Sequence, residues 1–304
     1  MSAKLSIKRT KFGGLAAMEI RTTELRLVVI TAKGPRVAVL TRRDGPNLLM
    51  WAPGKYRRGK WDLMGGHRLW LARPGADEAE ETYATDNRPC TVETFAQGIT
   101  VTAPVDPVHR TQRGVKFTVR AADRIELEHF VTNCGDMLWS GGLWAITSTL
   151  PLAGVNYSVP LGDGSSWDYA TIIAIRTWGR NQGAKTFNDP QFGFTDDMFC
   201  LHPGGRESKR MLKADPGIIG MYDPAQKLVF AKHAAYLPDA NYPLGTNLAL
   251  YIGNDNFMAE MESMGPCATV KPGHTLKHTE TWVLRDAKAA PTAAQLKALF
   301  RPPL

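Results

Sequence analysis

The sequence predicts an all-β fold made of antiparallel strands, and three observations support this. Short runs of alternating polar and apolar residues recur along the chain, a pattern typical of strands that bury one face. Gly, Pro, Asn and Asp separate these runs, as expected for turns. Long amphipathic helical patterns are nearly absent. We therefore expect two stacked sheets of many strands, with long loops around a cleft.

Six runs carry the strand pattern clearly. They span residues 24–31, 36–41, 115–120, 124–131, 169–177 and 227–232. In the fourth run, His129 shares a face with Ile125 and Leu127, which predicts a core histidine. The segments 151–168 and 181–217 are rich in glycine and polar residues, and we predict them to be long loops.

One short helix is predicted near the carboxyl terminus, at about residues 292–300. Thr292 followed three residues later by Gln295 is the pattern of a capping box. The apolar face of this helix consists of Leu296, Leu299 and Phe300. Two prolines follow and prevent its continuation.

The 304 residues are 43% hydrophobic, which is enough for a substantial core. Strand patterning resumes after each predicted loop, and we find no internal repeat or linker. The sequence therefore predicts a single domain over residues 1–304, with its core from about residue 20 to 285.

The net charge of +8 comes from scattered basic residues, with the densest group at residues 55–60. No nucleic-acid-binding motif surrounds this group, so we expect no nucleic-acid partner.

No apolar stretch is long enough to span a bilayer, and none follows the basic amino terminus as in a signal peptide. A cytoplasmic protein without a membrane partner is expected. The four cysteines fit no zinc template, so we expect no metal or cofactor.

The stretch Met258-Ala-Glu260-Met-Glu262-Ser-Met-Gly265-Pro266 predicts a strand with two carboxylates on one face. A Pro-Gly turn and a second strand follow. Two carboxylates beside a core are costly unless they are solvated, paired or used in chemistry. Such a pair can differ in pKa, so that Glu262 or Glu260 serves as a base. A solvated sheet face, with partners such as Lys271 or Lys277, explains the same pattern.

The segment Gly65-Gly66-His67-Arg68-Leu-Trp70 is a second candidate region. The reference pKa of a histidine lies near neutrality, so His67 could complement a glutamate base as the acid. Arg68 and Trp70 suit a sugar, through hydrogen bonds to hydroxyls or a carboxylate and through stacking on the ring. A tight turn with a core tryptophan is the structural alternative.

Trp144, which follows two glycines closely, is the preferred stacking platform for a sugar ring. The other predicted substrate-binding residues are Asp86, Asn87, Lys209, Lys213 and Asp239. A lysine that faces the cleft could hold a carboxylate or phosphate. Turn formation, core packing and solvated lysines remain alternative explanations for these residues.

The order of these motifs resembles an uncharacterised bacterial family related to the aldose 1-epimerases. The resemblance covers about residues 20 to 285 and rests on Gly-Gly-His67-Arg68-Leu-Trp, the Asp-Asn-x-Pro turn, Leu-Trp144-Ala-Ile-Thr and the glutamate stretch. It implies a galactose-mutarotase-like supersandwich with an open carbohydrate-binding cleft. It also implies that Glu262 is the base toward the anomeric hydroxyl, with Glu260 as the fallback. The usual acid of these enzymes is a histidine on a central strand. The corresponding stretch here has Trp144, so His67 or His129 would have to replace it.

The sequence thus predicts a carbohydrate-active, aldose 1-epimerase-like protein that performs acid–base chemistry on a free sugar or sugar acid. The expected partner is a mono- or oligosaccharide, either neutral or anionic. Two alternatives stay open on the same scaffold. One is a non-catalytic sugar-binding protein, and the other is a lyase or glycosidase that acts on oligosaccharides.

Overall fold

Two large antiparallel sheets make up nearly the whole fold, which confirms the predicted class. The computed structural model describes residues 5–59, 61–72, 85–162, 170–174 and 188–301. Within them the first sheet has 11 strands. In spatial order these are β1 (Ser6–Phe12), β2 (Leu15–Arg21), β3 (Leu25–Ile30), β4 (Arg36–Arg42), β7 (Gly66–Ala72), β12 (Trp139–Thr149), β21 (Ala259–Met264), β20 (Leu248–Ile252), β17 (Ser208–Ala214) and β14 (Ala170–Ala174), with β22 (Ala268–Val270) paired to β12.

The second sheet has 10 strands in the described part of the chain. They are β15 (Phe192–Phe194), β16 (Met198–Leu201), β13 (Asn156–Pro160), β18 (Ile218–Asp223), β19 (Leu228–His233), β23 (Thr275–Asp286), β11 (Arg124–Asn133), β10 (Thr111–Ala121), β9 (Gly98–Thr102) and β8 (Thr91–Phe95). A separate small hairpin pairs β5 (Arg57–Arg58) with β6 (Trp61–Asp62). Three short 3-10 turns, η1 (Thr85–Asn87), η2 (Pro243–Gly245) and η3 (Asn254–Asn256), lie between strands.

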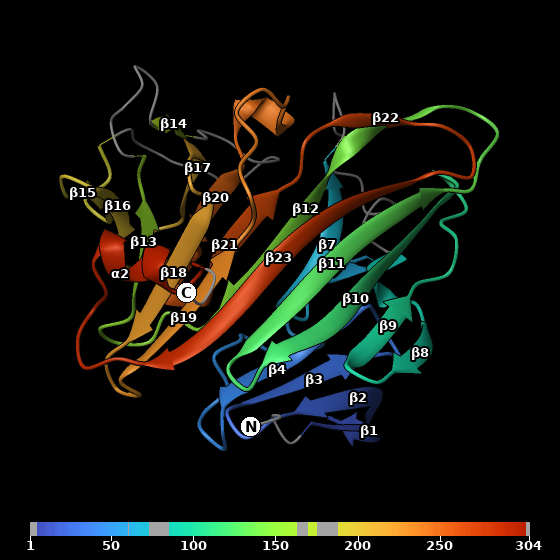
Figure 1. Cartoon of the computed structure of the whole chain (residues 1–304), viewed down its shortest axis with the longest axis horizontal. Helices are drawn as coiled ribbons and strands as arrows, with labels where there is room; N and C mark the ends of the chain where they lie inside the picture. The colour runs from blue at the N-terminus through green and yellow to red at the C-terminus, as the bar shows by residue number, and fades with distance from the viewer. Residues whose placement is uncertain (1–4, 60, 73–84, 163–169, 175–187, 302–304) are drawn as a thin grey trace.

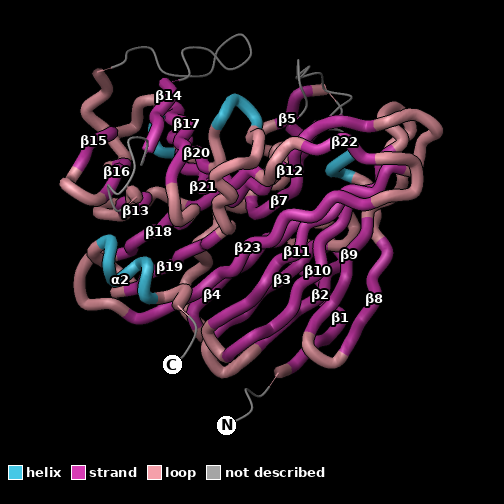
Figure 2. The backbone as a smooth tube through the Cα atoms, turned by 45° about the horizontal axis from the view of Figure 1, so that its top comes forward, coloured by secondary structure: helices cyan, strands magenta, loops and turns pink. Residues whose placement is uncertain are grey.

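The core fills the space between the two sheets. In Figure 1, β23, β11 and β10 of the second sheet cross in front of β12 and β7 of the first, and Figure 2 shows the same two layers from a second angle. Leu27, Leu250 and Met261 from the first sheet form one fully buried cluster with Phe117 and Trp282 from the second. Burial of each such side chain contributes about 1.5–3 kcal/mol, so this layer is the main source of stability.

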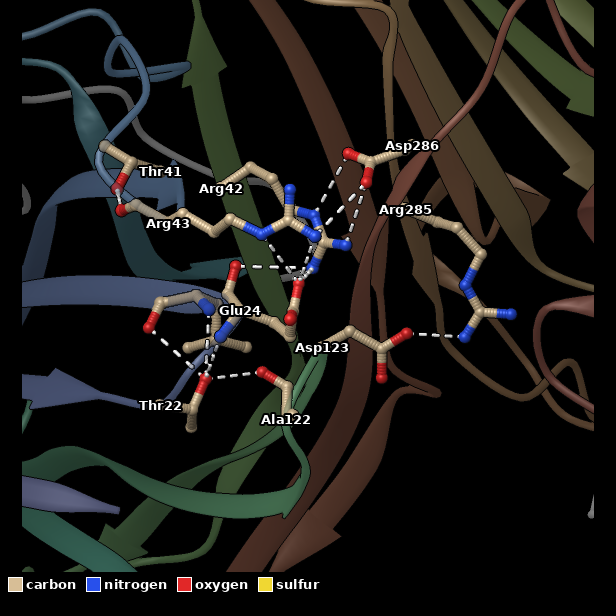
Figure 3. A network of polar contacts seen from close by, with 10 residues as sticks. Thr22, Glu24, Thr41, Arg42, Arg43, Ala122, Asp123, Arg285 and Asp286 are labelled. Carbon is tan, nitrogen blue, oxygen red and sulfur yellow. Dashed lines mark hydrogen bonds and ion pairs between the residues drawn. The ribbon is translucent and has the colours of Figure 1, made fainter. Parts of the chain in front are cut away.

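Polar contacts join the sheets where β4 and β23 end (Figure 3). Arg42 at the end of β4 contacts Glu24 at 2.5 Å and Asp286 of β23 at 3.2 Å. Thr22, beside β3, donates its hydroxyl to the carbonyl of Ala122 in the β10–β11 turn, at 2.5 Å. Because the contacts of Arg42 with Asp286 and of Thr22 with Ala122 bridge the two layers, this end of the sandwich is closed by side-chain bonds as well as by packing.

The strand predictions at 24–31, 36–41, 115–120, 124–131 and 227–232 correspond to β3, β4, β10, β11 and β19. The strand predicted at 169–177 corresponds to β14 at residues 170–174. Residues 169 and 175–177 lie outside the described residues. The two predicted long loops were partly wrong. The first contains β13, and the second contains β15, β16 and β17.

The predicted carboxyl-terminal helix is α2 (Ala293–Ala298), and its capping box is confirmed. The Thr292 side chain accepts from the Gln295 amide at 3.3 Å, and the Gln295 side chain accepts from the Thr292 amide at 2.9 Å. Leu296 is fully buried against β18, where a Cβ on Gly220 would lie 2.7 Å from Leu296 Cδ2. No helix in the described ranges is long and apolar enough to cross a membrane.

We predict that Thr292→Ala loosens α2 without changing the sheets. Loss of an N-cap hydroxyl typically costs about 1 kcal/mol, so hydrogen exchange of the α2 amides should become faster by about fivefold. Thr292→Ser keeps the accepting oxygen and serves as the matched control. Equal exchange rates in the two variants would contradict the assigned role of the cap.

Candidate functional site

The central strands of the first sheet separate the predicted site residues onto two faces. Directly paired residues share a face, and β12 pairs Ile146 with both Arg68 of β7 and Glu262 of β21. The next residue of β12, Thr147, pairs with His67 and Met261. Because Met261 packs in the core between the sheets, Thr147 and His67 also point inward. Arg68 and Glu262 point to the opposite side, which we call the outer face.

Seven predicted residues share the outer face. They are Arg68, Trp70, Trp144, Glu260, Glu262, Lys209 and Lys213. The two lysines were expected in a loop, and this was wrong, since both lie on strand β17. Loops cover this face, because Trp61 of β6 packs on Trp70 and Pro243 of η2 packs on Gly142. The expected open cleft is therefore not seen over these side chains in the described ranges.

Glu262 is completely buried and is held by one of its two oxygens. Trp144 donates its indole N–H to Oε2 at 2.7 Å, and the Lys209 ammonium donates to the same oxygen at 2.8 Å. The other oxygen, Oε1, has no hydrogen-bond partner among the described residues. Burial raises the pKa of Glu262, while the charge of Lys209 opposes this shift and that of Glu260 adds to it. The result is a fixed carboxylate with one unused acceptor.

Glu260, two residues earlier, has a different environment. Its Oε1 accepts from Arg68 Nη2 and from the Ser148 hydroxyl, each at 3.0 Å. Ser148 also accepts from Arg68 Nη1 at 3.0 Å, so the three side chains form a closed triangle of contacts. The alternative of a solvated sheet face with Lys271 or Lys277 as partners is wrong, because both glutamates are buried and pair with Arg68 and Lys209 from other strands of the same sheet.

Indoles and cations alternate across the outer face. The guanidinium of Arg68 lies 4.5 Å above the Trp70 ring, and the Lys209 ammonium lies 4.7 Å above the Trp144 ring. The two indoles meet edge to face, with 5.8 Å between their centroids. Each cation is thus positioned both by a carboxylate and by an aromatic face.

Asp86 and Asn87 lie beside this face on η1. Asp86 accepts the indole N–H of Trp70 and accepts from Arg113 at 3.2 Å, so it anchors an aromatic side chain. Both polar atoms of the Asn87 side chain are buried without a partner among the described residues. Asp239, by contrast, is exposed in the turn region between β19 and β20, so it does not join the other predicted residues.

The expected placement of His67 beside Glu262 is wrong. His67 points into the interior, where its Nδ1 lies 2.9 Å from Thr147 Oγ1 and its Nε2 lies 2.7 Å from His129 Nε2. A glycine precedes it for a steric reason. Gly66 has φ +73°, and a Cβ there would lie 2.1 Å from the Val37 carbonyl oxygen. The predicted core position of His129 is confirmed, since it is fully buried.

Sequence reasoning missed the polar cluster inside the sandwich. Lys232 of β19 and Glu280 of β23 form a fully buried ion pair at 2.5 Å, surrounded by His67, His129 and His278. Ser263 of β21 joins it, through contacts of 2.5 Å to Glu280 and 2.7 Å to His278 Nε2. The available signal was the spacing of His278, Glu280 and Trp282, which places all three on one face of β23.

Three members of this cluster meet the spacing of a metal site. Ligand atoms of His67, His129 and Glu280 lie within 4.8 Å of one another. The ammonium of Lys232 already contacts the Glu280 carboxylate, and the charge of Lys232 is a main reason why the pKa of Glu280 is held well below its usual range against the effect of burial. A divalent cation would have to displace that ammonium. These residues therefore fit a protein-supplied cation better than a metal.

No family model and no curated protein sequence matches the chain. Solved structures do match its fold. A galactose mutarotase-like protein from Clostridium acetobutylicum has a TM-score of 0.64 at 10% identity over 93% of this chain and 99% of that one. A galactose mutarotase related enzyme from Lactobacillus acidophilus has a TM-score of 0.56 at 11% identity, over 94% and 100%.

A TPR-domain containing protein from Parabacteroides distasonis gives a TM-score of 0.63 at 13% identity over 95% of this chain. The chain spans about half of that protein, with 49% of it covered. At these identities the likeness shows the fold alone, and the fold is galactose-mutarotase-like, as the sequence motifs implied.

The interior histidines predict a loss of stability in mild acid. Burial is the main reason why the pKa values of His67 and His129 fall below their usual range, and it lowers the pKa of His278 to about 3. The unfolded chain binds more protons than the folded one below pH 6.5, so stability is complete above that pH and decreases as pH falls. His278 alone should cost about 2 kcal/mol between pH 6.5 and 5.

Urea unfolding at pH 7 and pH 5 measures this loss. His278→Gln should reduce the pH dependence, whereas His274→Gln, which changes an exposed histidine, should leave it unchanged. Equal pH dependence in the wild type and in His278→Gln would show that His278 is not buried in its neutral form.

Proposed function

We propose that the outer face binds an aldose and that Glu262 acts as the general base in an aldose 1-epimerase-like interconversion of its anomers. The observation that carries this proposal is the environment of Glu262. One oxygen is fixed by Trp144 and Lys209, while Oε1 has no partner in the described part of the chain. A raised pKa brings a carboxylate closer to the range in which a base both accepts and returns a proton near neutral pH.

In this reaction Oε1 of Glu262 removes the proton of the anomeric hydroxyl, and an acid protonates the ring oxygen as the ring opens. Closure after rotation of the aldehyde reverses both transfers, so no proton is gained or lost. His67 faces the interior and cannot serve as this acid. Lys209 is our candidate, because its ammonium contacts Glu262 on the outer face.

The charges on this face favour a neutral sugar over an anionic one. Arg68 is paired with Glu260 and Lys209 with Glu262, so both cations are already neutralised. The indoles of Trp70 and Trp144 supply apolar ring faces, and the Asn87 amide offers a donor and an acceptor for hydroxyls. Entry of a sugar requires movement of the covering residues, among them the hairpin that carries Trp61.

A non-catalytic sugar-binding protein is the second candidate. The observation that favours it is Trp144, because an indole N–H donates a hydrogen bond but does not exchange a proton in catalysis. The two candidates differ in what removal of the Glu262 charge does. If the protein is an enzyme, removal of this charge lowers turnover. If it is a binding protein, the wild type already shows no turnover.

We predict that Glu262→Gln lowers the rate of anomer interconversion by about 100-fold or more, because general base catalysis typically contributes a factor of this size. NMR exchange on a panel of aldoses measures the rate. Glu128→Gln, at an exposed ion pair with Lys277, is the matched control and should retain the wild-type rate. Saturable binding without turnover in the wild type would instead support the sugar-binding protein. New reducing ends from oligosaccharides would support a glycosidase. Both of these results would be compatible with a carbohydrate ligand on the outer face.

Lys209→Met should slow the reaction, because it removes the candidate acid, and should also shift the pH profile of the rate that remains. The Lys209 charge lowers the pKa of Glu262, so its removal raises that pKa and leaves less of the base ionised at neutral pH. The acidic limb of the kcat profile should therefore move to higher pH. Lys277→Met, which removes an exposed lysine from Glu128, is the control. An acidic limb at the wild-type position in Lys209→Met would contradict the assigned coupling.

A further inference from the structure

The buried polar cluster contacts the strands of the candidate site from the interior side of the first sheet. On β21, Lys232 donates to the Met261 carbonyl at 3.0 Å, and Met261 lies between Glu260 and Glu262. Ser263, the residue after Glu262, contacts Glu280 and His278. The strand that carries both glutamates is thus bonded on its inner side at two successive inward residues.

The neighbouring strands are held in the same way. On β12, Thr147 accepts from Lys232 at 3.1 Å, and the next residue is Ser148, which holds Glu260. On β7, His67 contacts Thr147 and His129, and the next residue is Arg68. Each inward polar residue is therefore the chain neighbour of an outward site residue.

All the groups that make these contacts from the other side belong to the second sheet. Lys232 lies on β19, His129 on β11, and Glu280 and His278 on β23. All four are buried, with exposures of 0–7%. A single ammonium, that of Lys232, bridges β23, β12 and β21 through Glu280, Thr147 and Met261. Two strands that carry site residues, β12 and β21, are thus held by one side chain from the opposite sheet.

Stability alone does not account for a charge pair in this place. Apolar side chains of similar volume often replace a buried ion pair without loss of stability, because desolvation offsets much of the attraction. Apolar packing is not directional, so it does not fix the position of one strand relative to another as hydrogen bonds do. Hydrogen bonds of 2.5–3.1 Å to Glu280, Thr147 and Met261 fix the position of each strand along and across the sheet.

We propose that Lys232 and Glu280 are positioning residues that hold the outer-face glutamates in working geometry through the backbone of β21. This inference rests on the proposed function for its effect on turnover, but its effect on geometry can be measured without any sugar. Neither residue touches the outer face, so they act through Met261, Ser263 and Thr147. A displacement of about 1 Å at a reacting group can cost about 100-fold in rate.

The test is the double variant Lys232→Met/Glu280→Gln. Removing both charges together avoids leaving one of them buried and unpaired, while the lysine bonds to Thr147 and Met261 are lost. The expected result is a folded protein whose rate of anomer interconversion falls at least tenfold. Arg42→Gln/Asp286→Asn removes an ion pair between the same two sheets at the closed end, and should retain the wild-type rate.

A second readout reports geometry directly. The indole N–H of Trp144 donates to Glu262, so its proton NMR signal lies downfield while that bond is intact. The signal, assigned by its loss in Trp144→Phe, should move upfield in the double variant and stay in place in the Arg42/Asp286 control. Should the double variant fail to fold, Ser263→Ala removes only the hydroxyl beside Glu262 and should move the same signal by a smaller amount.

The outcomes separate the two proposals. If the wild type converts no sugar, the proposed reaction fails, while the Trp144 signal still decides whether the cluster positions Glu262. If the signal stays in place in both the double variant and Ser263→Ala, the positioning role is overturned, whatever the activity of the wild type. A rate within twofold of the wild type in the folded double variant overturns it as well.

Discussion

Alternation of side chains along β7, β12 and β21 is the constraint on which both polar centres of this protein depend. On these three strands, consecutive residues belong to different environments. Arg68, Ser148 and Glu262 face outward, while His67, Thr147 and Ser263 face the interior. Because the strands are directly paired, the outward residues meet across the sheet, and so do the inward ones. One backbone register thus assembles two separate networks.

The buried carboxylates of the two networks differ in how many of their oxygens receive hydrogen bonds. Inside the sandwich, Glu280 receives bonds from Lys232, Ser263 and Trp282, so both of its oxygens are occupied. On the outer face, Glu262 receives two bonds on one oxygen and none on the other among the described residues. A saturated carboxylate is a structural element, whereas a carboxylate with a free buried acceptor retains the capacity to take a proton or a hydroxyl. This contrast is the physical basis for placing chemistry at Glu262.

Local patterns in the sequence were sufficient for strands such as β3, β4, β10, β11 and β19, for the capped helix, and for the shared face of Glu260 and Glu262. They failed where partners come from distant strands. His67 was assigned to the same site as Arg68, but the two are adjacent residues of β7 and therefore point to opposite faces. Lys209 was assigned to a loop because its charged neighbours obscure the strand pattern of β17, where Lys209 is buried by its ion pair with Glu262 of β21. The strand predicted after the glutamate stretch and its Pro-Gly turn is β23, which belongs to the other sheet than β21. Such pairings depend on register across the sheet, which a single sequence does not encode locally.

Trp144 stands where the resemblance to the aldose 1-epimerases implies a histidine, and this difference bears on the proposed reaction. A histidine can pass a proton in either direction near neutral pH, whereas an indole N–H only donates a hydrogen bond. In the described part of the chain, Lys209 is the remaining group that contacts Glu262 and carries a transferable proton. In the proposed reaction, Lys209 and Glu262 are therefore the acid and the base, and they are already in contact through Oε2 of Glu262. Transfer of the lysine proton to the sugar leaves a neutral amine beside a buried carboxylate. That state is favourable only if the sugar hydroxyl gives its own proton to Glu262 in the same event, which couples the two transfers on this scaffold.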